Sequence, residues 1–334
     1  MTTNLFVLRY RCMKLLRLSS FFFLLLLFSC NKEELSNLAS DQIDFPQNLS
    51  AYNIYIGDPN DLIPNTDYVE YELGSALFTD YADKQRLIKI PEGSEMKQIN
   101  NGLPSFPDGT IIVKTFFYYF DKGDPSKGKR VIETRLLVKE AGLWNVADYL
   151  WNDDQSDGIL IEDGYNTSVN YIDENGQPQV IGYHVPSIRE CATCHAVNNA
   201  LSPIGPKLRS MNIDVDSDMG STNQLAHFQS MGILEDFEYA SVSSTPNFEN
   251  QLLPIDVRGR AYLDANCAHC HNALGFAADQ NLFLDYETPF EETNIDNNKW
   301  EIKTNLEDGT MPHIGATVID KEGVAMIIEY INSL

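Results

Sequence analysis

Cysteine is scarce in this chain, which has six among 334 residues. Cys12 and Cys30 belong to the N-terminal end, and four remain: Cys191, Cys194, Cys267 and Cys270. Four thiols permit two disulfides, but C-x-x-C disulfides are the small loops of redox enzymes, which do not require a histidine directly afterwards. A single zinc site made from both pairs would have to close the long segment between them and would leave those histidines unexplained.

Basic residues are also few, since 24 Lys and Arg stand against 48 Asp and Glu, for a net charge of −24. The basic residues of the first thirty lie in a segment that we expect to be removed, so the mature chain is more acidic still. This charge argues against nucleic acid and against an anionic lipid surface as partners. It agrees equally with docking to a basic protein and with solvation of the surface alone.

The apolar run FFFLLLLF at 21–28 is too short to span a bilayer but suits the core of a signal peptide. It leads into Leu27-Phe28-Ser29-Cys30, which resembles the lipobox of bacterial lipoproteins. We expect a lipoprotein signal peptide over 1–29, lipidation of Cys30 and a tether over 30–65. An ordinary cleaved signal is the alternative. The expected location is the envelope of a Gram-negative bacterium, with a lipid anchor in the outer membrane, at its periplasmic or surface face.

The remaining cysteines stand in CATCH (191–195) and CAHCH (267–271), and C-x-x-C-H is the attachment pattern of c-type haem. Two thiols separated by two residues can bind both vinyl groups on one porphyrin edge, and the next histidine then lies under the iron. We therefore predict two covalent haem c groups. The predicted ligands are Cys191, Cys194 and proximal His195 for the first haem, and Cys267, Cys270 and proximal His271 for the second. His269 is expected to face outward.

The distal ligands are less evident. Met311, followed by Pro312, is the expected distal ligand of the second haem, with His313 as competitor and a role as core filler as the alternative. For the first haem we favour His227 over Met211 and Met231, and an open sixth position is a further alternative. The carbonyl of Pro206 is expected to accept a hydrogen bond from His195.

The flanking sequence indicates helices beside both motifs. Ser187 and Glu190 form a capping box before the first motif. The C-terminal residues Val324, Ile327, Ile328 and Ile331 form an apolar helical stripe. Together with the helix that precedes the second motif, this stripe looks like a class I cytochrome c domain, in which Gly259 and Tyr262 would meet Tyr330.

The front half reads as β-structure. IIVKTFFYYF (111–120) and VIETRLLV (131–138) are rich in β-branched and aromatic residues, and Asn175-Gly176 is typical of a hairpin turn. We found no metal cluster or nucleophile pattern there. The predicted fold is multidomain, a β-rich N-terminal domain followed by two mainly α cytochrome c-like haem domains. The expected boundaries are 66–185 for the β-rich domain, 186–253 for the first haem c domain and 254–334 for the second.

The segments LFTDYADKQRLIKIPEG, FPDGTIIVKTFFYYF, ECATCH, RAYLDANCAHCHNALG and TMPHIGATVIDKEGVAMI, in this order, resemble the SO2930 family of dihaem c-type cytochromes. The resemblance covers roughly residues 70–334 and implies an exported dihaem protein with a β-rich front half. FPDGTIIVK also resembles cytochromes that carry a lysine-crosslinked haem and oxidise small nitrogen compounds, but the two haem motifs and the cytochrome c-like tail depart from that pattern.

We therefore expect a dihaem cytochrome that transfers electrons to or from a redox partner protein. The alternative is a dihaem redox enzyme, peroxidase-like or nitrogen-oxide-converting, with one open haem iron. A third hypothesis is a binding role, in which the β-rich domain docks a dehydrogenase and the haems accept its electrons.

Overall fold

The computed structural model describes residues 43–217, 220–312 and 314–334. The predicted signal peptide and Cys30 lie outside the described residues, as do the first part of the tether and His313. No helix within the described ranges has both the length and the apolar character needed to cross a membrane.

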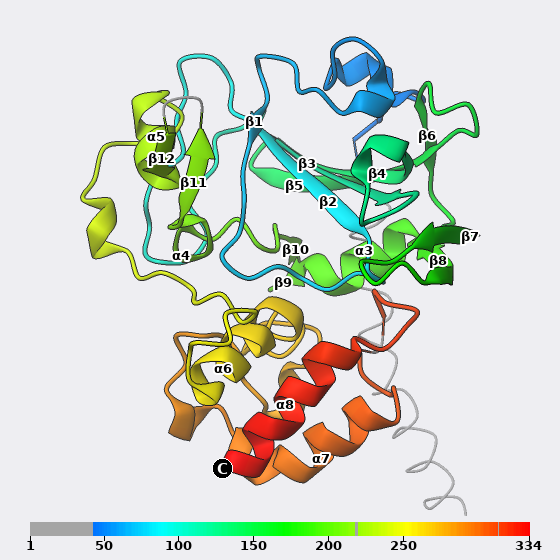
Figure 1. The fold of residues 1–334 in the computed structure, drawn as a ribbon. Coiled ribbons are helices and arrows are strands. Elements are labelled where there is room, and N and C mark those ends of the chain that lie inside the picture. Colours follow the sequence, from blue (N-terminus) through cyan, green and yellow to red (C-terminus); the bar gives the residue numbers. More distant parts are fainter. Residues whose placement is uncertain (1–42, 218–219, 313) are drawn as a thin grey trace, which may run out of the picture.

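An antiparallel six-stranded sheet forms the centre of the upper part in Figure 1. Its strands follow one another in chain order: β1 (Val69–Glu70), β2 (Asp83–Lys89), β3 (Ile111–Tyr119), β4 (Lys129–Glu140), β5 (Leu143–Trp151) and β6 (Gly158–Ile161). The central strands alternate side chains between two faces, because successive residues of a strand point to opposite sides. The strands predicted over 111–120 and 131–138 are confirmed as β3 and β4.

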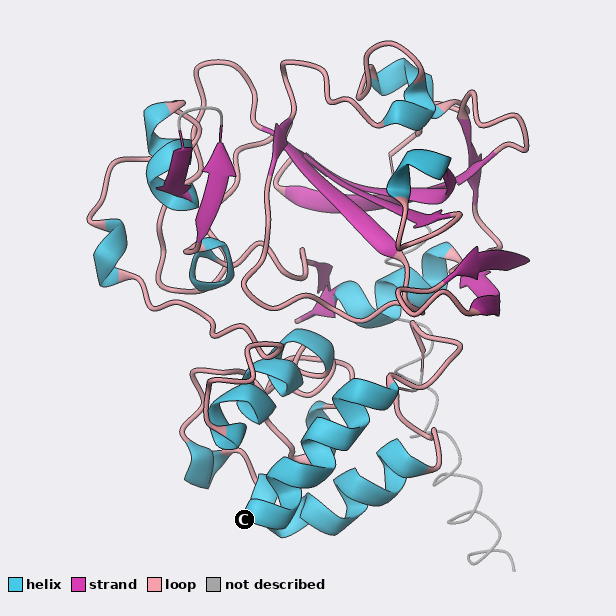
Figure 2. Cartoon of the chain, viewed as in Figure 1, coloured by secondary structure: helices cyan, strands magenta, loops and turns pink. Residues whose placement is uncertain are grey.

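Three two-stranded ribbons and several helices accompany this sheet (Figure 2). The ribbons are β7 (Tyr165–Ile172) with β8 (Pro178–Val185), β9 (Ala196–Val197) with β10 (Ala200–Leu201), and β11 (Asp214–Ser217) with β12 (Gly220–Asn223). The helices are α3 (Ile188–His195), α4 (Leu208–Met211), α5 (Gln224–Ser230), α6 (Ile255–Asn266), α7 (Ile295–Glu307) and α8 (Lys321–Ser333). Single 3₁₀ turns are η1 (Leu49–Tyr52), η2 (Pro59–Asp61), η3 (Pro125–Lys127), η4 (Tyr239–Ser241), η5 (Ala278–Gln280) and η6 (Phe290–Glu292).

The two faces of the sheet are covered by different parts of the chain. On one face, Leu87, Val113 and Leu136 pack with the N-terminal segment, including Leu49 and Ile54. We call the other face the motif face. Its apolar residues pack against residues from α3, β10, α4 and α5 at one end and against the β7–β8 hairpin at the other.

The prediction of two mainly α haem domains is wrong. The first motif belongs to the sheet's own core, because Cys191 and Ala192 of α3 are buried in the cluster that contains Ile88 and Ile112. The apolar residues that follow the motif are packed into this same cluster rather than into a separate helical core: Leu201, Leu208, Met211, Leu225 and Phe228. Residues 186–253 therefore have no core of their own and complete the β-rich half.

The C-terminal residues have a separate apolar core, to which α6, α7 and α8 all contribute. Helices α6 and α8 approach closely at Gly259, where an added Cβ would lie 2.5 Å from Cγ of Tyr330. The expected contact between Gly259 and Tyr330 is thus confirmed. Residues Tyr262 and Tyr330 are both buried in this core.

A buried ion pair joins the sheet half to the C-terminal helices. The guanidinium of Arg209 on α4 lies 2.6 Å from Oδ1 of Asp264 on α6, and both side chains are almost fully buried. Asp264 also accepts hydrogen bonds from Lys207 Nζ and from the backbone N–H of Tyr286. In addition, the Asp80 carboxylate accepts hydrogen bonds from the backbone N–H and the hydroxyl of Thr317 in the C-terminal half. The two halves are therefore held by polar contacts at several points.

Replacing Asp264 by Asn should lower the free energy of unfolding by about 3 kcal/mol, because it removes the buried counter-ion of Arg209 and leaves only the half-exposed carboxylate of Glu287. Urea denaturation followed by circular dichroism measures this loss. Asp285→Asn is the matched control, since Asp285 is more exposed and lies 3.8 Å from Lys207, and we expect a change below about 1 kcal/mol. Equal midpoints for Asp264→Asn and the parent chain would contradict this role of the pair.

Candidate functional site

The fold brings the two C-x-x-C-H motifs together at the junction of the two halves. Ligand atoms of Cys194 from the first motif and of His269 and Cys270 from the second all lie within 4.8 Å of one another. All four motif cysteines are free thiols. The sequence did not predict this juxtaposition, because the segment between the motifs is long and carries no local signal of its path.

The first motif ends a helix whose position is fixed at its N-terminus. Ser187 caps α3 through the Glu190 backbone N–H, and the Glu190 carboxylate accepts from the Ser187 N–H, so the predicted capping box is confirmed. At the other end, His195 Nδ1 lies 2.7 Å from the carbonyl oxygen of Ser202. A carbonyl can only accept, so Nδ1 carries the proton and Nε2 keeps its lone pair. The acceptor is Ser202 and not Pro206, which corrects the sequence-based expectation.

Both motif histidines are held in the neutral form that can bind a metal ion. Burial lowers the pKa of His195 to about 4. Burial also lowers the pKa of His271, whose Nδ1 is buried and has no hydrogen-bond partner within the described chain. His269 was expected to face outward, but it points toward the first motif and lines the cavity described below.

The thiols differ in acidity. Burial raises the pKa of Cys191, and it raises that of Cys267 to about 12. A hydrogen bond between the thiols of Cys194 and Cys270 raises the pKa of Cys194 and lowers that of Cys270. Cys270 therefore carries the largest thiolate fraction of the four near neutral pH.

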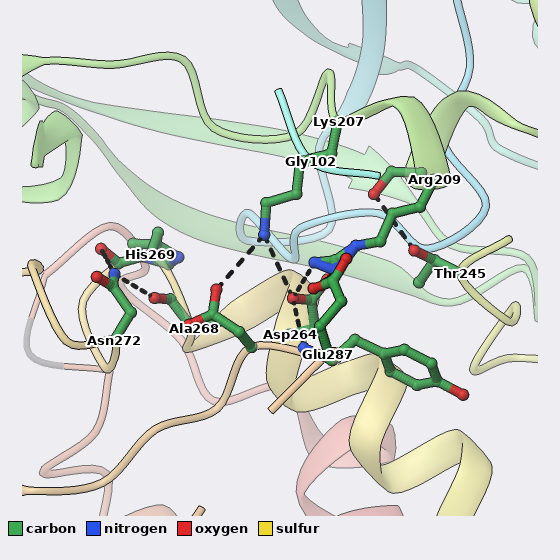
Figure 3. Close-up of polar contacts among 12 residues, drawn as sticks. Gly102, Lys207, Arg209, Thr245, Asp264, Ala268, His269, Asn272 and Glu287 are labelled. Atoms are coloured by element: carbon green, nitrogen blue, oxygen red, sulfur yellow. Dashed lines mark hydrogen bonds and ion pairs between the residues drawn. The ribbon is translucent and has the colours of Figure 1, made fainter. Parts of the chain in front are cut away.

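A cavity of about 220 Å³ lies beside the motifs at the junction. Cys194, Ser202, Ala268 and His269 line it from the motif side. Figure 3 shows His269 and Asn272 next to the ion pairs made by Lys207 and Arg209 with acidic residues such as Asp264 and Glu287. The volume is below the roughly 300–1,000 Å³ of pockets for drug-sized ligands.

The donor set fits haem c on both sides, because each motif offers two free thiols and a neutral imidazole. The hydrogen bond from His195 to Ser202 is the support that a metal-binding histidine usually has on its other ring nitrogen. The cavity of about 220 Å³ is too small for a porphyrin, so an attached porphyrin would displace side chains that now line the cavity. The junction must therefore open to take it.

The predicted distal ligands lie in different surroundings. Met311 and Cys267 of the second motif both pack against the C-terminal core. His227 lies on α5, whose buried residues Leu225 and Phe228 face the sheet core, and it does not line the cavity. Of its competitors, Met211 is fully buried in the sheet core and Met231 is 44% exposed.

Three cations of the cavity were missed by the sequence reading: Arg86, Lys114 and Lys207. For Lys114 a signal was available, because it interrupts the apolar strand IIVKTFFYYF at a position with the same parity as Ile112 and Phe116. A charged residue on the buried face of a strand is unusual and indicates either an ion-pair partner or a bound ligand.

In the folded, haem-free protein, iodoacetamide at about pH 8 should label Cys270 before the other three cysteines, because alkylation follows the thiolate fraction. Peptide mass mapping after short exposures measures the order. Cys194→Ala removes the thiol that stabilises the Cys270 thiolate and should slow its labelling. Earlier labelling of Cys191 or Cys267 than of Cys270 would contradict the acidity order.

The comparisons with known proteins supply no family for this chain: no family model, no curated protein and no solved structure matches it.

Proposed function

We propose that this chain is an exported dihaem c-type cytochrome of the SO2930 type that transfers electrons in the cell envelope. Cys191 and Cys194 would hold one haem covalently, with His195 on its iron. Cys267 and Cys270 would hold the other, with His271 on its iron. When bound, these groups supply one-electron exchange between ferrous and ferric iron. The observation that carries the proposal is the meeting of two complete C-x-x-C-H motifs at one junction.

The chain's own residues have definite parts in this proposal. Ser202 orients the His195 ring and leaves Nε2 free to bind iron. Cys194 and Cys270, whose sulfur atoms lie within 4.8 Å of each other, would each hold one haem, and so short a separation of the attachment points favours electron transfer between them. No general acid or base is needed, because an electron carrier moves no proton at a fixed atom.

The two sixth positions differ in what supports them. Met311 is proposed as distal ligand of the second haem, since it packs in the same core as Cys267. His227 remains the proposed distal ligand of the first haem, but it does not line the cavity that Cys194 and Ser202 line. This separation favours the alternative of a redox enzyme, peroxidase-like or nitrogen-oxide-converting, in which the first iron is open.

The lipid anchor at Cys30 and the Gram-negative envelope, with the outer membrane as the anchoring membrane, are also part of the proposal. They are supported by the apolar run at 21–28 and by the Ser29-Cys30 step. The partner would be a redox protein, and the acidic surface favours one with a basic docking face. The same surface argues against nucleic acid.

A second candidate function follows from the same cluster when it is considered as a metal site without haem. Cys194, His269 and Cys270 present three ligand atoms within 4.8 Å of one another, which is a donor set for Zn²⁺ or another thiophilic ion. This site and the haems are mutually exclusive, because thiols that are bound to porphyrin cannot also serve as thiolate ligands. His269 distinguishes the two, since the haem proposal gives it no ligand role.

Protein matured in a periplasm with haem c assembly machinery should carry two covalent haems, measured by pyridine haemochrome and intact mass. Changing Cys191 and Cys194 together to Ala should leave one haem. His269→Gln should keep both haems, whereas a thiophilic metal site would lose its ion. Colourless protein with one equivalent of zinc by elemental analysis, lost in His269→Gln, would replace the haem proposal by the metal site.

A further inference from the structure

A band of charge crosses the motif face of the central sheet. Arg86 on β2 lies opposite Lys114 on β3, Lys114 lies opposite Arg135 on β4, and Arg135 lies opposite Asp148 on β5. In the neighbouring row, Lys84, Phe116 and Glu133 are paired in the same way. Four basic side chains therefore share one patch of sheet.

This band divides two apolar clusters on the same face. Ile88, Ile112, Leu137 and Val146 lie on its one side under the first motif, and Phe116 and Tyr118 lie on the other side under the β7–β8 hairpin. Like charges directly opposite one another on a sheet repel, and the repulsion grows as water is removed. Such a row is unfavourable for folding unless negative charge is supplied.

The acidic side chains nearby do not supply enough negative charge to balance these four cations. Glu133 is fully buried and forms a two-point pair with Arg135 at 2.6 and 2.7 Å. Asp148 lies 3.5 Å from Arg135, but burial and the charge of Glu133 raise the pKa of Asp148 well above its usual value, which disfavours its charged form. Arg86 has Glu72 at 3.4 Å, and that carboxylate is half exposed.

Lys84 and Lys114 are the two cations of this patch that form no ion pair with the described residues, and Lys84 donates a hydrogen bond to the carbonyl oxygen of Ala82 at 3.1 Å. Among the described residues no carboxylate lies within 4.0 Å of the Lys114 ammonium. The ammonium lies over the Phe116 ring, 4.8 Å from the ring centroid. Burial and the neighbouring Arg86 and Lys84 lower the pKa of Lys114 well below its usual value, so a bound anion would stabilise the charged form of this side chain. The side chain lines the cavity at the junction, together with Arg86 and the first motif's Cys194. The acids of the lining, Asp264 and Asp285, are paired with Arg209 and Lys207.

We propose that Arg86 and Lys114 form a binding site for an anionic carboxylate or oxyanion group in the cavity beside the first motif. Two sources have this chemistry, a small free oxyanion and the carboxylates of a haem held at Cys191 and Cys194. The cavity of about 220 Å³ has room for a small oxyanion with its waters, at about 30 Å³ for each water. The free-anion source needs no haem; the haem source rests on the proposed function.

The test uses the mature protein and titrates it calorimetrically with sodium nitrite and, separately, sodium sulfate at constant ionic strength. The variant is Lys114→Met, which keeps the length of the side chain and removes its charge. Lys89→Met is the matched control, because Lys89 also lies on the sheet and over an aromatic ring, Tyr68 at 5.3 Å, but pairs with Asp67 outside the cavity.

Saturable binding that weakens at least tenfold in Lys114→Met, about 1.4 kcal/mol, and is unchanged in Lys89→Met assigns the site to a free oxyanion. If neither anion binds, the haem source predicts that Lys114→Met shifts the midpoint potential of one haem to more negative values, since a nearby positive charge that favours ferrous iron is gone. That shift must be absent in Lys89→Met.

The proposal is overturned if Lys114→Met behaves as the parent does in both measurements. If Lys114→Met does not fold, Arg86→Gln replaces it with the same expectations, because Arg86 lines the same cavity. Failure of the dihaem proposal is recognised separately by the haem count, and calorimetry still reports anion binding in a protein without haem.

Discussion

The placement of both cysteine motifs depends on the buried pair between Arg209 and Asp264. Arg209 follows the first motif on α4, and Asp264 precedes the second on α6, so the pair fixes the distance between the segments that carry them. Polar contacts from Asp80 to Thr317 and from Phe78 to Asn266 support the same junction. Because a buried charge strongly requires its partner, this contact sets the register of the two halves more strictly than apolar packing alone.

One face of the sheet combines ordinary packing with a charged band, and the two serve different ends. The apolar residues at either end of the motif face hold α3 and the β7–β8 hairpin in place. The band between them adds no apolar burial and places like charges side by side. Departures of this kind from stable packing concentrate at functional sites, and this one lies beside the first motif and the junction cavity. The proposed electron transfer and the proposed anion binding would thus share one region.

Local patterns in the sequence were sufficient for several elements. Val131 to Val138 and the run that begins at Ile111 are strands because they are rich in residues suited to a pleated surface, and the turn at Asn175-Gly176 joins β7 to β8. The capping box at Ser187 also follows from neighbouring residues. The close contact of Gly259 with Tyr330 is long-range and was expected from the resemblance of the C-terminal helices to a class I cytochrome c domain.

What the sequence did not predict is which apolar faces pack together. The residues after the first motif look like the start of a small helical domain, but their buried side chains, such as Leu208 and Phe228, join the sheet core. Hydrophobic periodicity shows that a face is buried and does not say against what. The pairing of Arg209 with Asp264 and the approach of His269 to Cys194 are likewise long-range and leave no local signature.

The burial of Cys191 against the sheet limits when a group can be attached to its sulfur atom. Its side chain is only 6% exposed, and Ala192 beside it is fully enclosed. An assembly enzyme cannot reach a sulfur atom inside a folded core, so any thioether at this position has to be formed before α3 packs onto the sheet. In the proposed dihaem cytochrome, a chain that folded before attachment would lack the haem at Cys191.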